Sequence, residues 1–185
     1  MLADTQGKKL NMFVSDYVVF DLETTGTNCN RDEVIEISAV KVIGGIPVDE
    51  FSMLVNPNMH IPYFATEVNG ITDSMVKDAP AFDVALKAFN EFVEDLILVG
   101  HNINSFDMKF IWRDSVKYFG KIFSNDYVDT LPIARVLLPG ISHSLVNLSE
   151  YYGISSEGAH RALNDCRMNR LVYECLEEEM HNPKV

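Results

Sequence analysis

Residues 17–26 read YVVFDLETTG, an apolar run that ends in two carboxylates and a turn. The start of this run predicts a buried strand over residues 17–22, because it is almost continuously apolar. Residues i and i+2 of a strand face the same side, so Asp21 and Glu23 present two carboxylates together while Leu22 points into the core. Two like charges at the end of a buried strand are unfavourable unless a cation lies between them, and oxygen ligands suit hard divalent cations such as Mg²⁺ or Mn²⁺. This strand end is a candidate metal site, with a pair of solvent-facing carboxylates as the alternative.

The rest of the chain reads as further strands, followed by helices that alternate with short strands. Apolar and β-branched runs predict the strands, and apolar spacings of three and four residues predict the helices. Gly44 and Gly45 predict a hairpin turn, and Pro57 and Pro62 predict a break in regular structure. This order is typical of an α/β fold with a mixed sheet. The expected strands are 17–22, 34–42, 49–56, 96–100 and 127–130, and the expected helices are 81–95, 105–119, 131–138, 145–152 and 161–180.

Length and composition indicate one domain. The chain has 185 residues, of which 47% are hydrophobic and 23% charged, values typical of a globular protein. We expect a single domain over residues 1–185, with a lead-in over 1–16 and a core over about 17–180. The three cysteines are an odd number without metal-binding spacing, so we expect reduced thiols in a cytoplasmic protein. No apolar run approaches the roughly 20 residues that a bilayer requires, so we expect no membrane partner.

Charge limits the ways in which this chain can bind nucleic acid. It carries 15 Lys and Arg against 27 Asp and Glu, a formal net charge of −12. Such a surface disfavours indiscriminate adhesion to DNA or to anionic membranes. A nucleic-acid ligand needs metal ions or a local basic stripe to offset the repulsion. Lys109, Arg113, Lys117 and Lys121 form one candidate stripe along the helix expected over 105–119 and just beyond it, and a solvated helix face is the alternative.

Two further segments place polar side chains beyond the ends of predicted elements. In GHNINSFD, residues 100–107, a short strand leads through a polar loop to Asp107, and sites in open α/β sheets form at the carboxyl ends of strands. In GAHRALND, residues 158–165, His160 and Asp165 would lie about 140° apart around a helix, so His160 must lie on the preceding loop. An imidazole suits a general base near neutral pH. The alternatives are a first-turn aspartate that complements the helix dipole and an ordinary surface histidine.

The three segments together resemble the three exonuclease motifs of the DnaQ-like, DEDDh-type 3′–5′ exonucleases. The motifs correspond to residues 21–26, 101–107 and 160–165, and the resemblance spans almost everything from residue 17 to residue 176. The segments VNGIT at 68–72 and DTL at 129–131 also look like parts of this family. The nearest likeness is to proofreading exonuclease domains of bacterial replicative DNA polymerases. The resemblance implies a ribonuclease H-like fold, a mixed five-stranded sheet flanked by helices.

The resemblance also implies a metal-dependent hydrolysis of phosphodiester bonds from the 3′ end. It assigns two divalent cations, Mg²⁺ or Mn²⁺, to Asp21, Glu23, Asp107 and Asp165, and it makes His160 the general base. The products would be nucleoside 5′-monophosphates, released from single-stranded or frayed DNA in proofreading or repair. The residues that it places against the substrate, besides His160, are Leu22, Thr24, Thr25, Ile71 and Asn102.

Other functions stay open at the level of the sequence. RNA-trimming relatives share the motifs, and no residue here tests for the 2′-hydroxyl that separates RNA from DNA. A non-catalytic nucleic-acid-binding module of the same fold is a second alternative. Asn69, Asn164 and Cys166 depart from the residues common in the family, which leaves substrate preference open, but none replaces a metal ligand. A DNA polymerase is a possible partner, although only residues 181–185 follow the last expected helix, so we expect no flexible polymerase-binding tail in this sequence.

Overall fold

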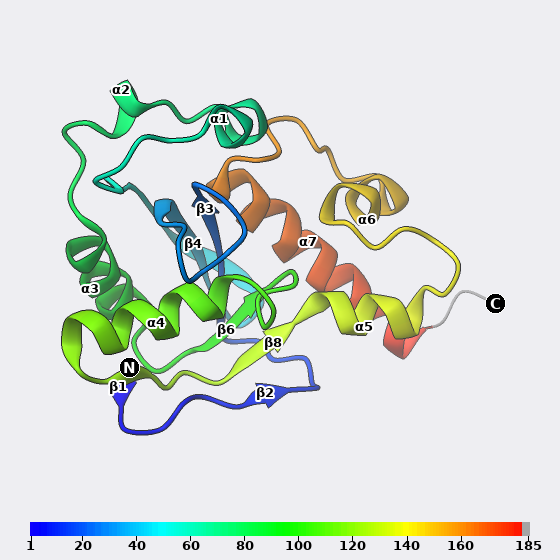
Figure 1. Cartoon of the computed structure of the whole chain (residues 1–185). Coiled ribbons are helices and arrows are strands. Elements are labelled where there is room, and N and C mark those ends of the chain that lie inside the picture. Colours follow the sequence, from blue (N-terminus) through cyan, green and yellow to red (C-terminus); the bar gives the residue numbers. More distant parts are fainter. Residues whose placement is uncertain (183–185) are drawn as a thin grey trace.

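A six-stranded mixed sheet forms the centre of the structure (Figure 1). The computed structural model describes residues 1–182. The strands lie in the order β2-β8-β6-β3-β4-β5, with β3 antiparallel to β4 and parallel to β6, and a separate two-stranded sheet pairs β1 with β7. The strands are β1 Leu2–Ala3, β2 Lys9–Leu10, β3 Tyr17–Thr24, β4 Val34–Ile43, β5 Ile46–Leu54, β6 Ile97–Gly100, β7 Ile122–Phe123 and β8 Tyr127–Asp129.

The mixed sheet expected from the sequence is confirmed, and it contains one strand more than the five expected. The additional strand, β2, belongs to the lead-in 1–16 and pairs in parallel with β8. β1 lies in the same lead-in. Strands of two residues are too short to show an alternating pattern, so the sequence does not reveal them.

The five longer helices agree with the expected ones, with ends that differ by two residues or fewer. The break in regular structure expected at Pro57 and Pro62 is confirmed, because no helix or strand covers residues 55–62. Two short helices that the sequence did not predict follow this break. Pro62 is the extended N-cap residue of the first of these helices, so it precedes the helix instead of breaking it. The helices are α1 Tyr63–Asn69, α2 Asp73–Val76, α3 Phe82–Val93, α4 Asp107–Phe119, α5 Thr130–Leu137, α6 Leu145–Tyr152 and α7 Ala162–His181.

Both faces of β3 are covered, which explains its nearly continuous apolar sequence. Val18 and Phe20 pack in a cluster with α3 and α4, whereas Tyr17 and Val19 pack in a second cluster with α7. All four side chains are at most 2% exposed. Helices therefore cover both faces of the sheet, as Figure 1 shows.

The parallel strands β3, β6 and β8 end at the same edge of the sheet. Val19 of β3 pairs with Val99 of β6, and Gly100 pairs with Asp129 of β8. α7 begins at this edge, because its first backbone N–H donates to Glu36 of the neighbouring strand β4 at 3.1 Å. Ligands of open α/β sheets bind at the carboxyl ends of strands. The topology thus brings the three sequence motifs to one place.

Two expectations from the sequence are that a membrane span and a polymerase-binding tail are absent. Within residues 1–182, no helix has the length and the apolar character needed to span a bilayer. The expected absence of a polymerase-binding tail concerns residues 181–185, of which 183–185 lie outside the described part of the chain. The single-domain boundary stays a prediction.

Phe89 on α3 joins three strands in the core. Its ring centroid lies 5.3 Å from that of Phe20, 6.1 Å from Phe51 and 5.8 Å from Phe123. Phe89→Ala leaves a cavity among these rings, so we expect the free energy of unfolding to fall by about 3–5 kcal/mol. Urea denaturation measures the loss, with Lys87→Ala at an exposed position of the same helix as the control. A loss no larger than that of the control would contradict the packing role of Phe89.

Candidate active site

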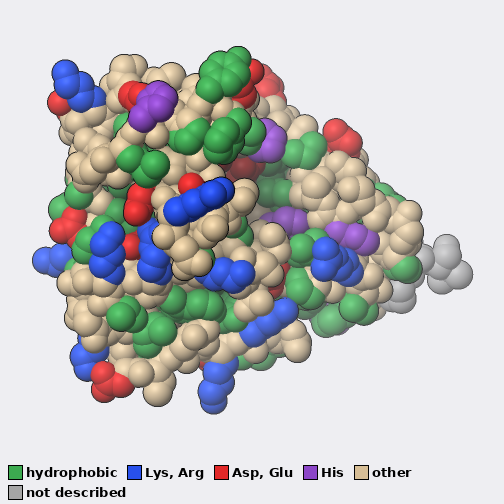
Figure 2. Space-filling model, viewed as in Figure 1, with side chains coloured by type: hydrophobic (Ala, Val, Ile, Leu, Met, Phe, Trp, Pro, Cys, Tyr) green, Lys and Arg blue, Asp and Glu red, His purple; other side chains and the backbone are tan. Residues whose placement is uncertain are grey.

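Three carboxylates converge where β3 ends and α7 begins. Asp21 and Glu23 lie on β3, and Asp165 lies in the first turn of α7. One oxygen atom of each lies within 4.8 Å of the others. Figure 2 shows a hollow between the side chains over α1 and those over α6, with acidic and histidine side chains inside it. The pair expected from the alternation of β3 is thus part of a cluster of three.

Asp107 adds a fourth carboxylate from another element. It is the first residue of α4 and is 2% exposed. Its Oδ1 accepts a hydrogen bond of 3.1 Å from the backbone N–H of Leu22, which lies between Asp21 and Glu23 on β3. The structure therefore gathers all four expected metal ligands at one edge of the sheet.

The surroundings of these carboxylates disfavour their charged forms. Burial, and then the charges of Asp107 and Asp165, raise the pKa of Asp21 well above its usual range. Burial also raises the pKa of Asp107. Burial and the charge of Asp165 raise the pKa of Glu23 to about 7, and burial raises the pKa of Asp165 to about 6. A cation placed among the four groups relieves this repulsion.

The donor atoms of the cluster fit a hard divalent cation. Every converging ligand is a carboxylate, and all-oxygen sites suit Mg²⁺, Ca²⁺ or Mn²⁺. Cys166, the residue after Asp165, is not a further ligand. Its thiol is buried and donates to the carbonyl oxygen of Ser38 at 3.3 Å, and burial raises the pKa of this thiol. The cluster is an oxygen-only site able to hold a divalent cation.

His160 lies on the loop before α7, as the sequence predicted. The residue is exposed, and its φ of 65° puts it in the left-handed region. Its backbone N–H donates to both carboxylate oxygens of Asp165, at 3.3 and 3.2 Å. The Nδ2 atom of Asn164 donates to the carbonyl oxygen of Gly158 at 2.9 Å and closes the loop. His160 is therefore tied by its backbone to one member of the carboxylate cluster.

Glu36 belongs to this site although the sequence analysis did not single it out. It lies on β4 directly opposite Glu23 and is 3% exposed. Its carboxylate accepts hydrogen bonds from Arg161 Nη2 at 2.8 Å and Nε at 3.2 Å, and from the first backbone N–H of α7. The ion pair fixes the residue that follows His160. The sequence did carry a signal, because one carboxylate within a mostly apolar strand needs a partner when it is buried.

Comparison with known proteins identifies the family to which the chain belongs. The exonuclease family model (RNase_T) matches residues 18–173. The chain belongs to this exonuclease family. It is 39% identical over 171 residues to DNA polymerase III subunit epsilon of Aquifex aeolicus, covering 92% of this chain and 84% of that protein. It is 41% identical over 173 residues to a PolC-type DNA polymerase III of Clostridium perfringens, covering 91% of this chain but only 12% of the relative.

Solved exonuclease structures have the same fold. Exonuclease X, in complex with 5′ overhanging duplex DNA, gives a TM-score of 0.69 at 25% identity and covers 91% of this chain and 94% of that chain. Exonuclease I gives a TM-score of 0.76 at 17% identity and covers 90% of this chain and 44% of that chain. The expected ribonuclease H-like fold is confirmed, and so is the exonuclease family expected from the three motifs.

The residues expected to contact substrate differ in exposure. Leu22, Thr25 and Ile71 are at most 4% exposed, so their side chains are enclosed by protein. Thr24 is 8% exposed, and its hydroxyl donates to the carbonyl oxygen of Gly26. Asn102 is partly exposed. The role of all five in substrate binding stays a prediction, and the exposure favours Asn102 for a side-chain contact.

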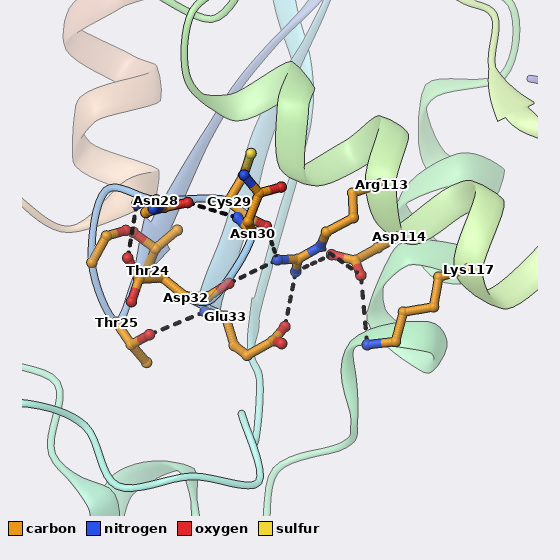
Figure 3. A network of polar contacts seen from close by, with 11 residues as sticks. Thr24, Thr25, Asn28, Cys29, Asn30, Asp32, Glu33, Arg113, Asp114 and Lys117 are labelled. Carbon is orange, nitrogen blue, oxygen red and sulfur yellow. Dashed lines mark hydrogen bonds and ion pairs between the residues drawn. The ribbon is translucent and has the colours of Figure 1, made fainter.

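Arg113 points into the protein and does not join a basic stripe on α4 (Figure 3). Its Nη2 atom lies 2.6 Å from Asp114, which is fully buried, and 2.8 Å from Glu33. Its Nη1 atom donates to two backbone carbonyls of the turn between β3 and β4. Arg113 therefore holds the turn that follows the two carboxylates of β3.

Two other cations of the expected stripe are also paired. Lys117 lies 3.8 Å from Asp114, and Lys121 lies 2.5 Å from Asp4. Lys109 lines a cleft beside the turn between β3 and β4, and no ion pair of this lysine occurs within residues 1–182. The candidate stripe is therefore interrupted, because its central arginine is used to hold the protein together.

The raised pKa values predict that the metal-free protein loses stability as the pH rises. The folded state binds protons at Glu23 and Asp165 up to about pH 7 and 6, whereas in the unfolded state these groups titrate near pH 4. The two groups therefore contribute fully to the free energy of unfolding at low pH. This contribution is lost as the pH rises through their folded-state pKa values. We expect the free energy of unfolding in EDTA to fall between about pH 4 and pH 7, by on the order of 1–3 kcal/mol, as measured by urea denaturation.

A carboxamide variant provides the control for this pH dependence. Asp21→Asn removes one of the repelling charges, so its stability in EDTA should change less over the same pH range. Saturating Mn²⁺ should raise the melting temperature of the wild-type protein at pH 8 and leave that of the variant closer to its metal-free value. Equal pH slopes for the two proteins would contradict the electrostatic account of the cluster.

The ion pair between Arg161 and Glu36 predicts an asymmetric response to mutation. Arg161→Ala leaves the buried carboxylate of Glu36 without its cation, so we expect the free energy of unfolding to fall by about 2 kcal/mol. Glu36→Gln leaves Arg161, whose side chain is 42% exposed, free to interact with water, so its cost should be smaller. Chemical denaturation of both variants tests this order, and a larger loss for Glu36→Gln would contradict it.

Proposed function

We propose that this protein is a metal-dependent 3′–5′ exonuclease that removes nucleotides from the 3′ end of single-stranded or frayed DNA. Each step would hydrolyse one phosphodiester bond and release a nucleoside 5′-monophosphate. The observation that carries the proposal is the cluster of Asp21, Glu23 and Asp165 at the edge of the sheet, with Asp107 and His160 tied to it by backbone hydrogen bonds.

The four carboxylates would hold two divalent cations, Mg²⁺ or Mn²⁺. Such cations lower the pKa of the attacking water and stabilise the charge of the leaving oxygen. The four ligands, Asp21, Glu23, Asp107 and Asp165, carry up to four negative charges, which two divalent cations balance. A protein with a net charge of −12 can thus present a near-neutral site to a phosphate.

His160 would remove the proton from the attacking water. An imidazole exchanges protons near neutral pH and suits this task. Its loop is exposed, while its backbone is tied to Asp165, so the imidazole stays beside the cluster but has room to move. Asn102 would contact the terminal nucleotide.

Two features of the relatives support DNA as the substrate and a polymerase as the partner. The relatives described above are an epsilon subunit of DNA polymerase III and a PolC-type polymerase III. Exonuclease X was solved with duplex DNA. We therefore assign this protein to proofreading or repair of DNA in the cytoplasm, with a DNA polymerase as its partner. Co-elution of the protein with a replicative polymerase in size-exclusion chromatography tests the partnership.

Hydrolysis of end-labelled oligomers tests the activity directly. Single-stranded DNA and RNA of matched sequence, labelled at the 5′ end, are incubated with Mg²⁺, Mn²⁺ or EDTA. We expect a metal-dependent ladder that shortens from the 3′ end and a higher rate for DNA than for RNA. His160→Ala should lower kcat by about 10²–10⁴-fold, because the general base is lost.

Two variants test whether the activity depends on the carboxylate cluster. Asp165→Asn should abolish the ladder, whereas His181→Ala, at the far end of α7, should leave it unchanged. A higher rate on RNA than on DNA would contradict the assignment of DNA as the substrate. An absence of turnover on both polymers with both metals would refute the exonuclease activity.

A further inference from the structure

The structure leaves few cations free to meet the phosphates of a DNA strand. The protein has a net charge of −12, and three of the four cations expected to form a stripe on α4 and just beyond it are engaged in ion pairs. Each phosphate that a Lys or Arg neutralises adds affinity that does not depend on base sequence. The cations that contact a strand must therefore be unpaired and close to the carboxylate cluster.

Arg135 on α5 meets both conditions. It is exposed, and no ion pair of this residue occurs in the described part of the chain. It lines a cleft of about 460 Å³ between α5, the start of α6 and the loop that follows β6. Among the residues that the structure describes, no carboxylate lines this cleft. The other lining residues are His101, Asn102, Leu131, His143, Ser144 and Leu145.

The cleft adjoins the candidate active site. Its residues His101 and Asn102 directly follow β6, whose carboxyl end lies beside that of β3. The same loop continues to Asp107, which is bonded to the backbone of β3. Figure 2 shows histidine and basic side chains together between α5 and α6, next to the hollow that contains acidic side chains. A strand with its 3′ end at the carboxylates can therefore pass over the cleft.

The polar groups of the cleft suit an anion. Arg135 offers a guanidinium fork, which binds phosphate oxygens in pairs. The first turn of α6 also lies here, and its N-cap residue Ser144 accepts a hydrogen bond from Asn147. Within residues 1–182, the backbone N–H groups of Leu145 and Val146 have no hydrogen-bond partner. A guanidinium and a helix N-terminus that face the same cleft both attract negative charge.

The two histidines shape the cleft through hydrogen bonds to backbone carbonyl oxygens. His101 Nε2 donates to the carbonyl oxygen of His143 at 2.8 Å, and its Nδ1 lies 2.9 Å from the hydroxyl of Thr130. Burial lowers the pKa of His101, which keeps this imidazole neutral. His143 Nε2 donates to the carbonyl oxygen of Leu138 at 2.9 Å. The permanent positive charge of the cleft is therefore that of Arg135.

We propose that the Arg135 cleft, formed by Arg135 and the start of α6, binds a backbone phosphate of the DNA strand on the 5′ side of the scissile bond. This inference rests on the proposed function. The cleft adds affinity for the strand and takes no part in the chemistry. The cleft affects only substrates that are long enough to reach it. A substrate with a single phosphate is too short to do so.

Two measurements on the full chain test the cleft, with Arg135→Gln as the variant and Lys87→Gln as a control of equal charge. Lys87 is an exposed residue of α3, which lies on the opposite side of the molecule from α5 and α6 (Figure 1). Binding of a labelled single-stranded 12-nucleotide DNA is followed by fluorescence anisotropy in Ca²⁺ over a range of salt concentrations. We expect Arg135→Gln to weaken binding by about 3–10-fold and to reduce the slope of log Kd against log salt by about 0.7.

Steady-state kinetics with Mg²⁺ complete the test. Arg135→Gln should raise KM for the same DNA and leave kcat nearly unchanged. Its rate on the p-nitrophenyl ester of thymidine 5′-monophosphate, which contains only the scissile phosphate, should equal that of the wild-type protein. Lys87→Gln should match the wild-type protein in every assay.

Three results would overturn the inference. These are an unchanged Kd and salt slope for Arg135→Gln, an equal loss on the single-phosphate ester, and an equal loss for Lys87→Gln. Failure of the proposed function gives a different result, because the wild-type protein would then hydrolyse neither DNA nor the ester. The anisotropy measurement needs no turnover, so it would still decide whether Arg135 contacts the strand.

Discussion

Electrostatic repulsion among carboxylates at one edge of the sheet is the constraint on which the site depends. Asp21, Glu23 and Asp165 converge within 4.8 Å, and Asp107 lies beside them. Each is held by structure that does not depend on a cation. β3 is covered on both faces, the backbone N–H of Leu22 holds Asp107, and the start of α7 holds Asp165. The fold thereby holds together charges that would separate in a flexible chain. A divalent cation that binds among them relieves their repulsion, and this relief favours cation binding.

The internal arginines show how the fold supports this edge. Arg161 neutralises Glu36, which lies opposite Glu23 and would otherwise add one more buried charge next to the cluster. Arg113 holds the turn that leads away from the end of β3. The charges of these two arginines are neutralised by carboxylates of the protein, so they contribute little attraction for a polyanion. In a protein this acidic, the surface cations that stay unpaired, such as Arg135, acquire particular importance for binding a strand.

Local patterns predicted most of the fold. Continuous apolar runs identify strands buried on both faces, and apolar spacing located five helices to within two residues. The same patterns failed where elements are too short to repeat, as in β1, β2 and the two helices after Pro62. Their presence depends on partners distant in the chain, since β2 pairs with β8 and β1 pairs with β7. No local rule includes those partners.

The sequence by itself determined the chemistry of the site. Alternation along a strand put Asp21 and Glu23 on one face, and the angle around a helix placed His160 on a loop. These relations hold because they follow from backbone geometry within a few residues. Only the tertiary structure decided which charges neutralise one another. Arg113 occupies a helix position that a basic stripe also requires, but its long side chain reaches Asp114 and the β3–β4 turn instead. Ion pairing depends on distances across the fold, and spacing along the chain does not contain them.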